Sequence, residues 1–142
     1  MPNLNKLVAK IRSDYPNLII QPGERTLFSP PSTIYYAKEA SSLEILHELG
    51  HALLKNANYS SDIELVRIES EAWQKAKELC QKYDVDWNED VAEDHIDTYR
   101  DWLHTISLCR NCQLTGFQDS AGIYHCSFCN ASWQNTIQPK DF

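Results

Sequence analysis

Two histidines that lie four residues apart constrain the fold of this chain more than any other feature of its sequence. They occur in the segment His47-Glu48-Leu49-Gly50-His51. On an α-helix, residues four apart point to the same side, so both imidazoles can face a single metal ion. Ser41 followed by Glu44 is a capping-box pattern, which predicts a helix that begins there and continues through the apolar run 43–54. The sequence therefore predicts a helix with two metal-binding side chains on one face.

Glu48, between the two histidines, completes the set of groups that a zinc hydrolase needs. A zinc ion acidifies a water molecule, and a neighbouring carboxylate takes the proton of that water and passes it to the leaving amine. Glu48 lies about 100° around the helix from His47. We expect His47 and His51 to bind a catalytic zinc ion and Glu48 to be the general base.

A hydrolytic zinc ion needs a third protein ligand, and the helix predicted over residues 62–83 offers four glutamates. Helical spacing places Glu69 in the middle of the apolar face, whereas Glu71 lies on a charged stripe that faces solvent. A buried carboxylate is costly unless it is paired or bound to a cation. Glu69 is therefore the preferred ligand, and a pair between Glu69 and a Lys or Arg of another element is the alternative. The four glutamates are Glu64, Glu69, Glu71 and Glu78.

Apolar periodicity predicts an α+β fold around the histidine helix. The fold class we expect is a small antiparallel sheet packed on the HExxH helix and two further helices, followed by a small zinc ribbon. Two domains follow, a zincin-like domain at 1–106 and an appendage at 107–142. The predicted helices are 3–13, 43–54, 62–83 and 88–107, and the predicted strands are 18–21, 26–29 and 33–36.

Four of the five cysteines form two Cys-x-x-Cys pairs separated by thirteen residues, which is a zinc-ribbon spacing. Four sulfurs fill the coordination shell of a zinc ion, so this second zinc would be structural and would activate no water. Two redox-active pairs are the alternative. The fifth cysteine, Cys80, has helical spacing from apolar residues and is predicted to be a buried, inert thiol. The predicted ligands are Cys109, Cys112, Cys126 and Cys129.

Aromatic residues of the predicted ribbon are expected to serve mainly in the core of this small domain. They are Phe117, Tyr124, Phe128 and Trp133.

Charge and hydropathy limit the partners of the chain. The formal net charge is -7 over 142 residues, and the charges of the ribbon cancel, so neither provides the basic surface that phosphate backbones require. The first six residues lack the apolar core of a signal peptide, and no apolar run is long enough to cross a membrane. We expect a cytoplasmic protein with a protein or peptide substrate, no membrane partner and no nucleic-acid partner.

His95 and His104 flank an acidic helix face, and one of them is a candidate donor to the oxyanion of a tetrahedral intermediate.

The HELGH segment followed by Glu69-Ser70-Glu71-Ala72 resembles the ImmA/IrrE-like metallopeptidases of the gluzincin group. The resemblance covers residues 30–83 and implies His47, His51 and Glu69 as zinc ligands in an enzyme that cleaves regulatory proteins. Trp73 departs from the family pattern, which has Asn or Asp at this position. A hydrogen bond that would orient a metal-binding histidine is therefore missing or supplied elsewhere, which bears on activity.

Two other functions remain open. The combination of HExxH with a four-cysteine ribbon resembles the SprT-like proteases that act on DNA-bound proteins, although their third ligand is a His shortly after the motif, where Lys55 and Asn56 stand here. The other is a non-catalytic, metal-stabilised interaction or regulatory module, which the departure at Trp73 motivates. The sequence predicts neither the substrate nor the oligomeric state.

Overall fold

The computed structural model describes residues 4–56 and 58–139. Asn3 of the first predicted helix and the last three residues of the predicted ribbon lie outside this range. The described residues form four helices and two small sheets, which confirms the predicted α+β class. Contacts between residues divide the chain into two units, Met1–Ala57 with Ser70–Glu89 and Asn58–Glu69 with Asp90–Phe142. The division at residue 106 stays a prediction, and each unit is described by itself.

The sheet of unit 1 has the strand order β1-β3-β2 and differs from the prediction in one pairing. β2 (Leu27–Ser29) and β3 (Thr33–Tyr36) are antiparallel, whereas β1 (Ile19–Pro22) runs parallel to β3. The loop after β1 crosses the end of β3 before β2 begins. Gly23 permits this crossing, because a Cβ at that position would lie 3.0 Å from Cβ of Tyr35. The sheet is therefore mixed.

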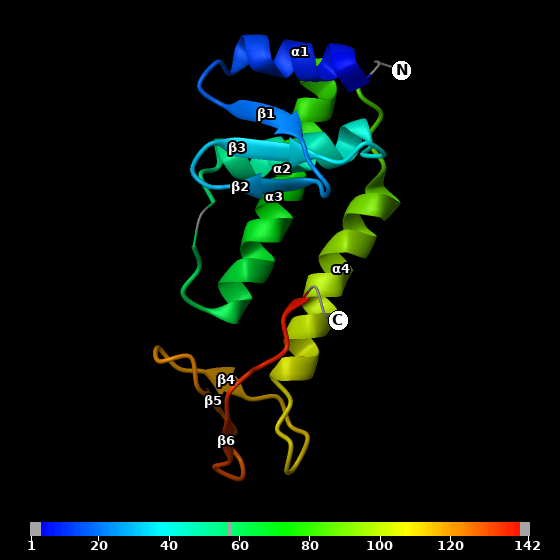
Figure 1. Cartoon of the computed structure of the whole chain (residues 1–142). Helices are drawn as coiled ribbons and strands as arrows, with labels where there is room; N and C mark the ends of the chain where they lie inside the picture. The colour runs from blue at the N-terminus through cyan, green and yellow to red at the C-terminus, as the bar shows by residue number, and fades with distance from the viewer. Residues whose placement is uncertain (1–3, 57, 140–142) are drawn as a thin grey trace. The chain divides into compact units, whose positions relative to one another are not determined.

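Two helices pack on this sheet through apolar side chains. α1 (Leu4–Asp14) lies beside β1, and α2 (Ser42–Leu53) lies against β2 and β3 (Figure 1). The buried residues recur at the helical spacing that the sequence predicted. α2 begins where expected, because Ser41 Oγ accepts a hydrogen bond from the Glu44 N–H at 3.1 Å. The buried apolar side chains of these elements are Leu7, Val8, Ile11, Ile20, Ile34, Leu43, Ile45, Leu46 and Leu49.

α3 (Asp62–Tyr83) meets α2 at Gly50. A Cβ on Gly50 would lie only 2.7 Å from the carbonyl oxygen of Ala72, so the two helices approach more closely than any larger residue allows. The buried face of α3 in unit 1 includes Ala72, Trp73, Ala76 and Cys80. Cys80 is buried, as predicted, and burial raises the pKa of its thiol.

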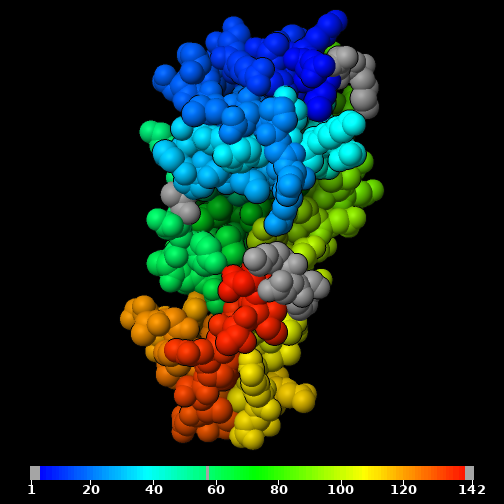
Figure 2. Space-filling model, viewed as in Figure 1, coloured from blue at the N-terminus to red at the C-terminus, as the bar shows by residue number. Residues whose placement is uncertain are grey.

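Unit 2 is built around the C-terminal half of α4 (Glu89–Ile106) and the ribbon strands. Trp102, Ile106 and Tyr124 form its core, with Leu65 and Trp133 packed against them. The ring of Trp133 stacks on that of Tyr124 at 5.7 Å. Figure 2 shows the last described residues, in red, lying over the yellow-green surface of α4.

Polar contacts tie the ribbon to the two helices of unit 2. Trp102 Nε1 donates to the Ile137 carbonyl and Trp133 Nε1 donates to the Ile106 carbonyl, both at 2.8 Å. Tyr124 OH donates to Asp62 Oδ2 at 2.7 Å. Buried indole N–H and phenol O–H groups therefore have acceptors, as a well-packed core requires.

The ribbon contains three two-residue strands in the order β4-β5-β6, with antiparallel pairing throughout. They are β4 (Phe117–Gln118), β5 (Tyr124–His125) and β6 (Ser132–Trp133). Tyr124 and Trp133 serve the core, as predicted for the ribbon aromatics, but Phe117 and Phe128 are 55% and 73% exposed. None of the helices in the described part of the chain is long and apolar enough to span a membrane.

Candidate metal centres

His47 and His51 lie one turn apart on α2, and their rings meet. Their relative exposures are 4% and 8%. The two Nε2 atoms lie 3.2 Å apart, and the rings are nearly perpendicular with centroids at 4.6 Å. Two imidazole nitrogens bound to one zinc ion at tetrahedral angles lie about 3.3 Å apart, given Zn–N bonds of about 2.0–2.1 Å. The spacing of this histidine pair therefore fits a shared metal ion.

The ring nitrogen of His51 that points away from His47, Nδ1, is hydrogen-bonded to the side-chain amide of Asn56. His51 Nδ1 lies 2.9 Å from Asn56 Oδ1. An amide oxygen only accepts hydrogen bonds, so Nδ1 of His51 carries the proton and donates it. In the neutral ring, Nε2 then has its lone pair toward His47, which is the form that binds metal.

Trp73 holds His47 through its ring face. The two rings stack with centroids 4.2 Å apart and an interplanar angle of 23°. Trp73 is buried at 4% exposure, and the ring of Trp87 packs on it at 6.1 Å. Trp73 therefore places a flat apolar surface against a metal-binding candidate.

The predicted carboxylates differ in burial. Glu48 is half-buried on α2 beside His47. Glu69 is buried at 7% exposure and Glu71 is exposed, as their helical positions predicted. Within unit 2, a carboxylate oxygen of Glu69 and a ring nitrogen of His95 lie within 4.8 Å of each other. His104 is exposed and contributes no ligand atom to the clusters of metal-binding side chains among the described residues.

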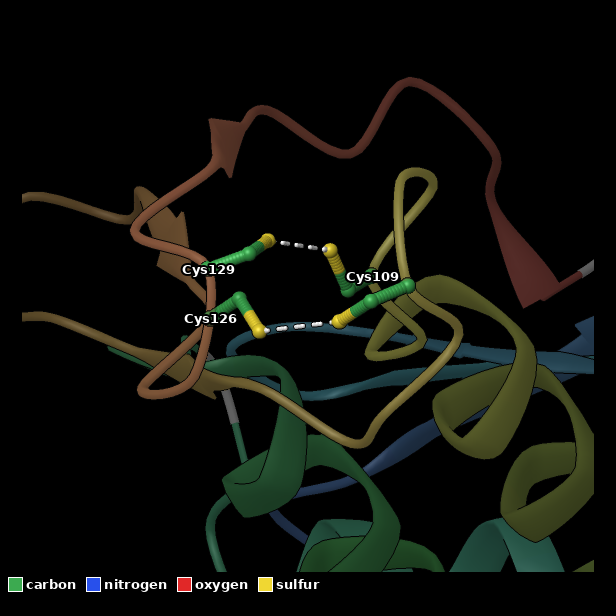
Figure 3. Close-up of side chains that lie close together, drawn as sticks. Cys109, Cys126 and Cys129 are labelled. Atoms are coloured by element: carbon green, nitrogen blue, oxygen red, sulfur yellow. Dashed lines mark hydrogen bonds between the residues drawn. The ribbon is translucent and has the colours of Figure 1, made fainter.

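The four ribbon cysteines converge on one point, and this cluster can hold a metal ion. All four Sγ atoms lie within 4.8 Å of one another. The sulfurs of Cys109 and Cys129 are 3.5 Å apart and those of Cys112 and Cys126 are 3.4 Å apart (Figure 3). Four sulfurs around one zinc ion have edges of about 3.8 Å, given Zn–S bonds of about 2.3 Å. Each short edge joins one Cys-x-x-Cys pair to the other.

The two Cys-x-x-Cys turns have the same backbone geometry. In the first, Gln113 N–H donates to the Cys109 carbonyl and Gln113 has φ 65°; in the second, Asn130 N–H donates to the Cys126 carbonyl and Asn130 has φ 63°. Each turn therefore ends in a left-handed residue four positions after its first cysteine. This repeat aims backbone N–H groups at the first sulfur of each pair.

These N–H groups favour thiolates, which are the forms that bind metal. Hydrogen bonds, chiefly from the N–H of Cys112, lower the pKa of Cys109 to about 6. The N–H groups of Cys129 and Phe128 lower the pKa of Cys126 in the same way. The Leu114 N–H also lowers the pKa of Cys112, but burial and the neighbouring thiols outweigh it and raise that pKa to about 12. A cation among the sulfurs would favour the thiolate at every position.

The sequence motifs did not predict two contacts, that of Asn56 with His51 and that of Asp119 with His125 in the ribbon. Asn56 lies in a stretch that reads only as a polar connection, and its approach to His51 depends on how the chain turns after α2. The Asp119–His125 pair in the ribbon, with Oδ2 and Nε2 2.7 Å apart, likewise follows no recognisable spacing.

No family model, curated protein or solved structure matches the chain.

Proposed function

We propose that the protein is a zinc-dependent metallopeptidase that hydrolyses peptide bonds in a protein substrate. The observation that carries the proposal is the histidine pair on α2, with its two Nε2 atoms 3.2 Å apart in a buried position beside Glu48. Its ligand set is His47, His51 and Glu69. Glu69 is included because it matches the ligand position of the ImmA/IrrE-like pattern and because it is buried.

Each residue has a distinct task in this proposal. A bound zinc ion would lower the pKa of a water molecule toward about 7 and polarise the scissile carbonyl. Glu48 accepts the proton of the attacking water and delivers it to the leaving amine. The carboxylate of Glu69 would neutralise part of the charge of a bound ion, and the ion would offset the cost of burying this carboxylate. His95, near Glu69, is a candidate hydrogen-bond donor to that carboxylate.

The ribbon would hold a second, structural zinc ion. Four thiolates leave no open coordination position, so this metal would contribute to folding rather than to hydrolysis. All five cysteines are free thiols, which suits a reducing compartment, and we propose the cytoplasm.

An extended peptide could add to an outer strand of the sheet in unit 1. β1 and β2 are the edge strands, and Ile19 and Leu27 on them are 53% and 37% exposed. Strand addition supplies backbone hydrogen bonds that are independent of substrate sequence, while alternate side chains give specificity. A protein or peptide substrate follows.

The substitution Glu48→Gln tests the mechanism. It keeps the size of the side chain and the histidine ligands but removes the base, so zinc content should remain and cleavage should fall by about 100-fold or more. Activity would be followed by mass spectrometry on a proteome-derived peptide library. Glu44→Gln, an exposed change on the same helix, is the matched control and should cleave normally. A Glu48→Gln protein that cleaves like wild type contradicts the mechanism.

A second candidate is a non-catalytic zinc module, and the stack of Trp73 on His47 favours it. The ring of Trp73 orients His47 by stacking on it, and stacking does not raise the basicity of an imidazole as a hydrogen bond to a carboxylate does. In this case the protein would bind two zinc ions and cleave none of the library peptides with any metal.

A further inference from the structure

The turn that ends α2 brings the side chain of Asn56 back to His51. The N–H of Lys55 donates to the Ala52 carbonyl at 3.1 Å, and the N–H of Asn56 donates to the His51 carbonyl at 3.0 Å. Lys55 has φ 58°, in the left-handed region. These three features define a Schellman motif, which reverses the chain direction at a helix end. Asn56 therefore occupies the position that faces back onto the last turn.

Asn56 contacts His51 twice, with two different groups. Its backbone N–H bonds the carbonyl of His51, and its side-chain Oδ1 accepts from Nδ1 of the same residue at 2.9 Å. The first contact fixes where Asn56 lies and would survive any substitution except proline. The second depends on the side chain alone. The turn thus delivers an acceptor to the ring at a position that the helix itself cannot supply.

The side-chain contact decides which nitrogen of His51 can bind a metal ion. With the proton held on Nδ1, the lone pair of the neutral ring is on Nε2, 3.2 Å from Nε2 of His47. Without an acceptor at Nδ1, the ring is free to place its proton on Nε2, where it blocks coordination. The ring could also rotate about its χ2 bond, since that torsion is broad.

We propose that Asn56 is a positioning residue that fixes the tautomer and orientation of His51 for metal binding. The metal-binding part rests on the proposed function, whereas the tautomer part concerns the protein without metal in this centre. Asn56 thereby supplies an orienting hydrogen bond to His51 from the turn after α2. A carboxylate can replace the amide, because it also accepts hydrogen bonds.

The test uses full-length Asn56→Ala and Asn56→Asp proteins, with Asn58→Ala as the matched control in the same polar connection. Asn58 is exposed, and its removal should change nothing. Long-range ¹H–¹⁵N NMR correlations report the tautomer of His51 after a mild chelator has removed any metal ion from the histidine pair on α2. Competition between the protein and a chromophoric chelator for Zn²⁺ reports the affinity of the same centre.

The expected result is a loss of the Nδ1–H tautomer in Asn56→Ala and a zinc affinity about 10–100-fold lower than in wild type. Asn56→Asp should keep the tautomer and an affinity close to that of wild type, which a merely structural role of the turn would not require. An unchanged tautomer and affinity in Asn56→Ala would overturn the proposal. If wild type binds zinc only in the ribbon, the proposed function fails, and the tautomer measurement still decides the role of Asn56.

Discussion

Replacing Gly50 with alanine probes the close approach of α2 and α3 that positions the histidine helix. The added Cβ would lie 2.7 Å from the Ala72 carbonyl oxygen and 3.4 Å from Cβ of Lys75. The first distance is a clash with a backbone atom, which has no alternative rotamer. The helices would have to move apart, and packing would be lost along the contact.

Two opposing effects set the size of the change. Alanine is favoured over glycine inside a helix by about 1 kcal/mol. An extra methyl group in a packed contact costs about 1–3 kcal/mol, and a clash with backbone belongs at the upper end. The net expectation for Gly50→Ala is a loss of about 2 kcal/mol, which corresponds to a fall in Tm of about 4–8 °C for a chain of this size.

Thermal unfolding of the zinc-loaded protein by circular dichroism measures this change. Gln74→Ala, an exposed substitution on α3, is the control and should stay within about 0.5 kcal/mol of wild type. Because Gly50 lies less than one turn from His47, Gly50→Ala should also weaken zinc binding at the histidine pair. A Gly50→Ala protein as stable as wild type, or more stable, would refute the helix contact described above.

Two further predictions concern the ribbon. Gln113→Gly should stabilise the zinc-loaded protein by about 0.5–1 kcal/mol in thermal unfolding, because glycine removes the strain of the left-handed backbone conformation. Asn130→Gly should change the stability less, because asparagine tolerates that conformation. Equal effects of the two substitutions would contradict this explanation. The pKa of Asp119 is lowered, chiefly by its hydrogen bond from His125, so the carboxylate stabilises the fold above a pH of about 4 and loses this contribution as the pH falls further. Urea unfolding of Asp119→Asn should therefore show a weaker pH dependence below pH 4 than wild type, and an identical dependence would count against the pair.

The helices could be predicted because the residue pattern along a helix determines both where it begins and which of its sides is buried. The cap at Ser41 and the buried position of Glu69 both follow from spacing along a helix, a local property. The pairing of β1 with β3 was not predictable, because Pro22-Gly23 indicates a turn but not that the chain then passes over Tyr35. Strand order depends on tertiary contacts that a turn signal does not contain.

The site shows the same division between ligands and the residues that orient them. Metal-binding residues can be recognised from residue type and spacing, as in HExxH and Cys-x-x-Cys. Asn56 cannot, because its contact with His51 depends on the left-handed conformation of Lys55. A glycine at that position would have indicated a left-handed helix end, but a lysine does not. Trp73 is visible only as a departure from a pattern, and its stack on His47 follows from the packing of α3.

The zinc content of the purified 142-residue chain decides whether the histidine pair on α2 holds a metal ion. Elemental analysis should find two zinc ions per chain in the wild type and one in His47→Ala, with the remaining ion lost when Cys109 is also replaced. One zinc ion per chain in both the wild type and His47→Ala would contradict a metal centre at the histidine pair.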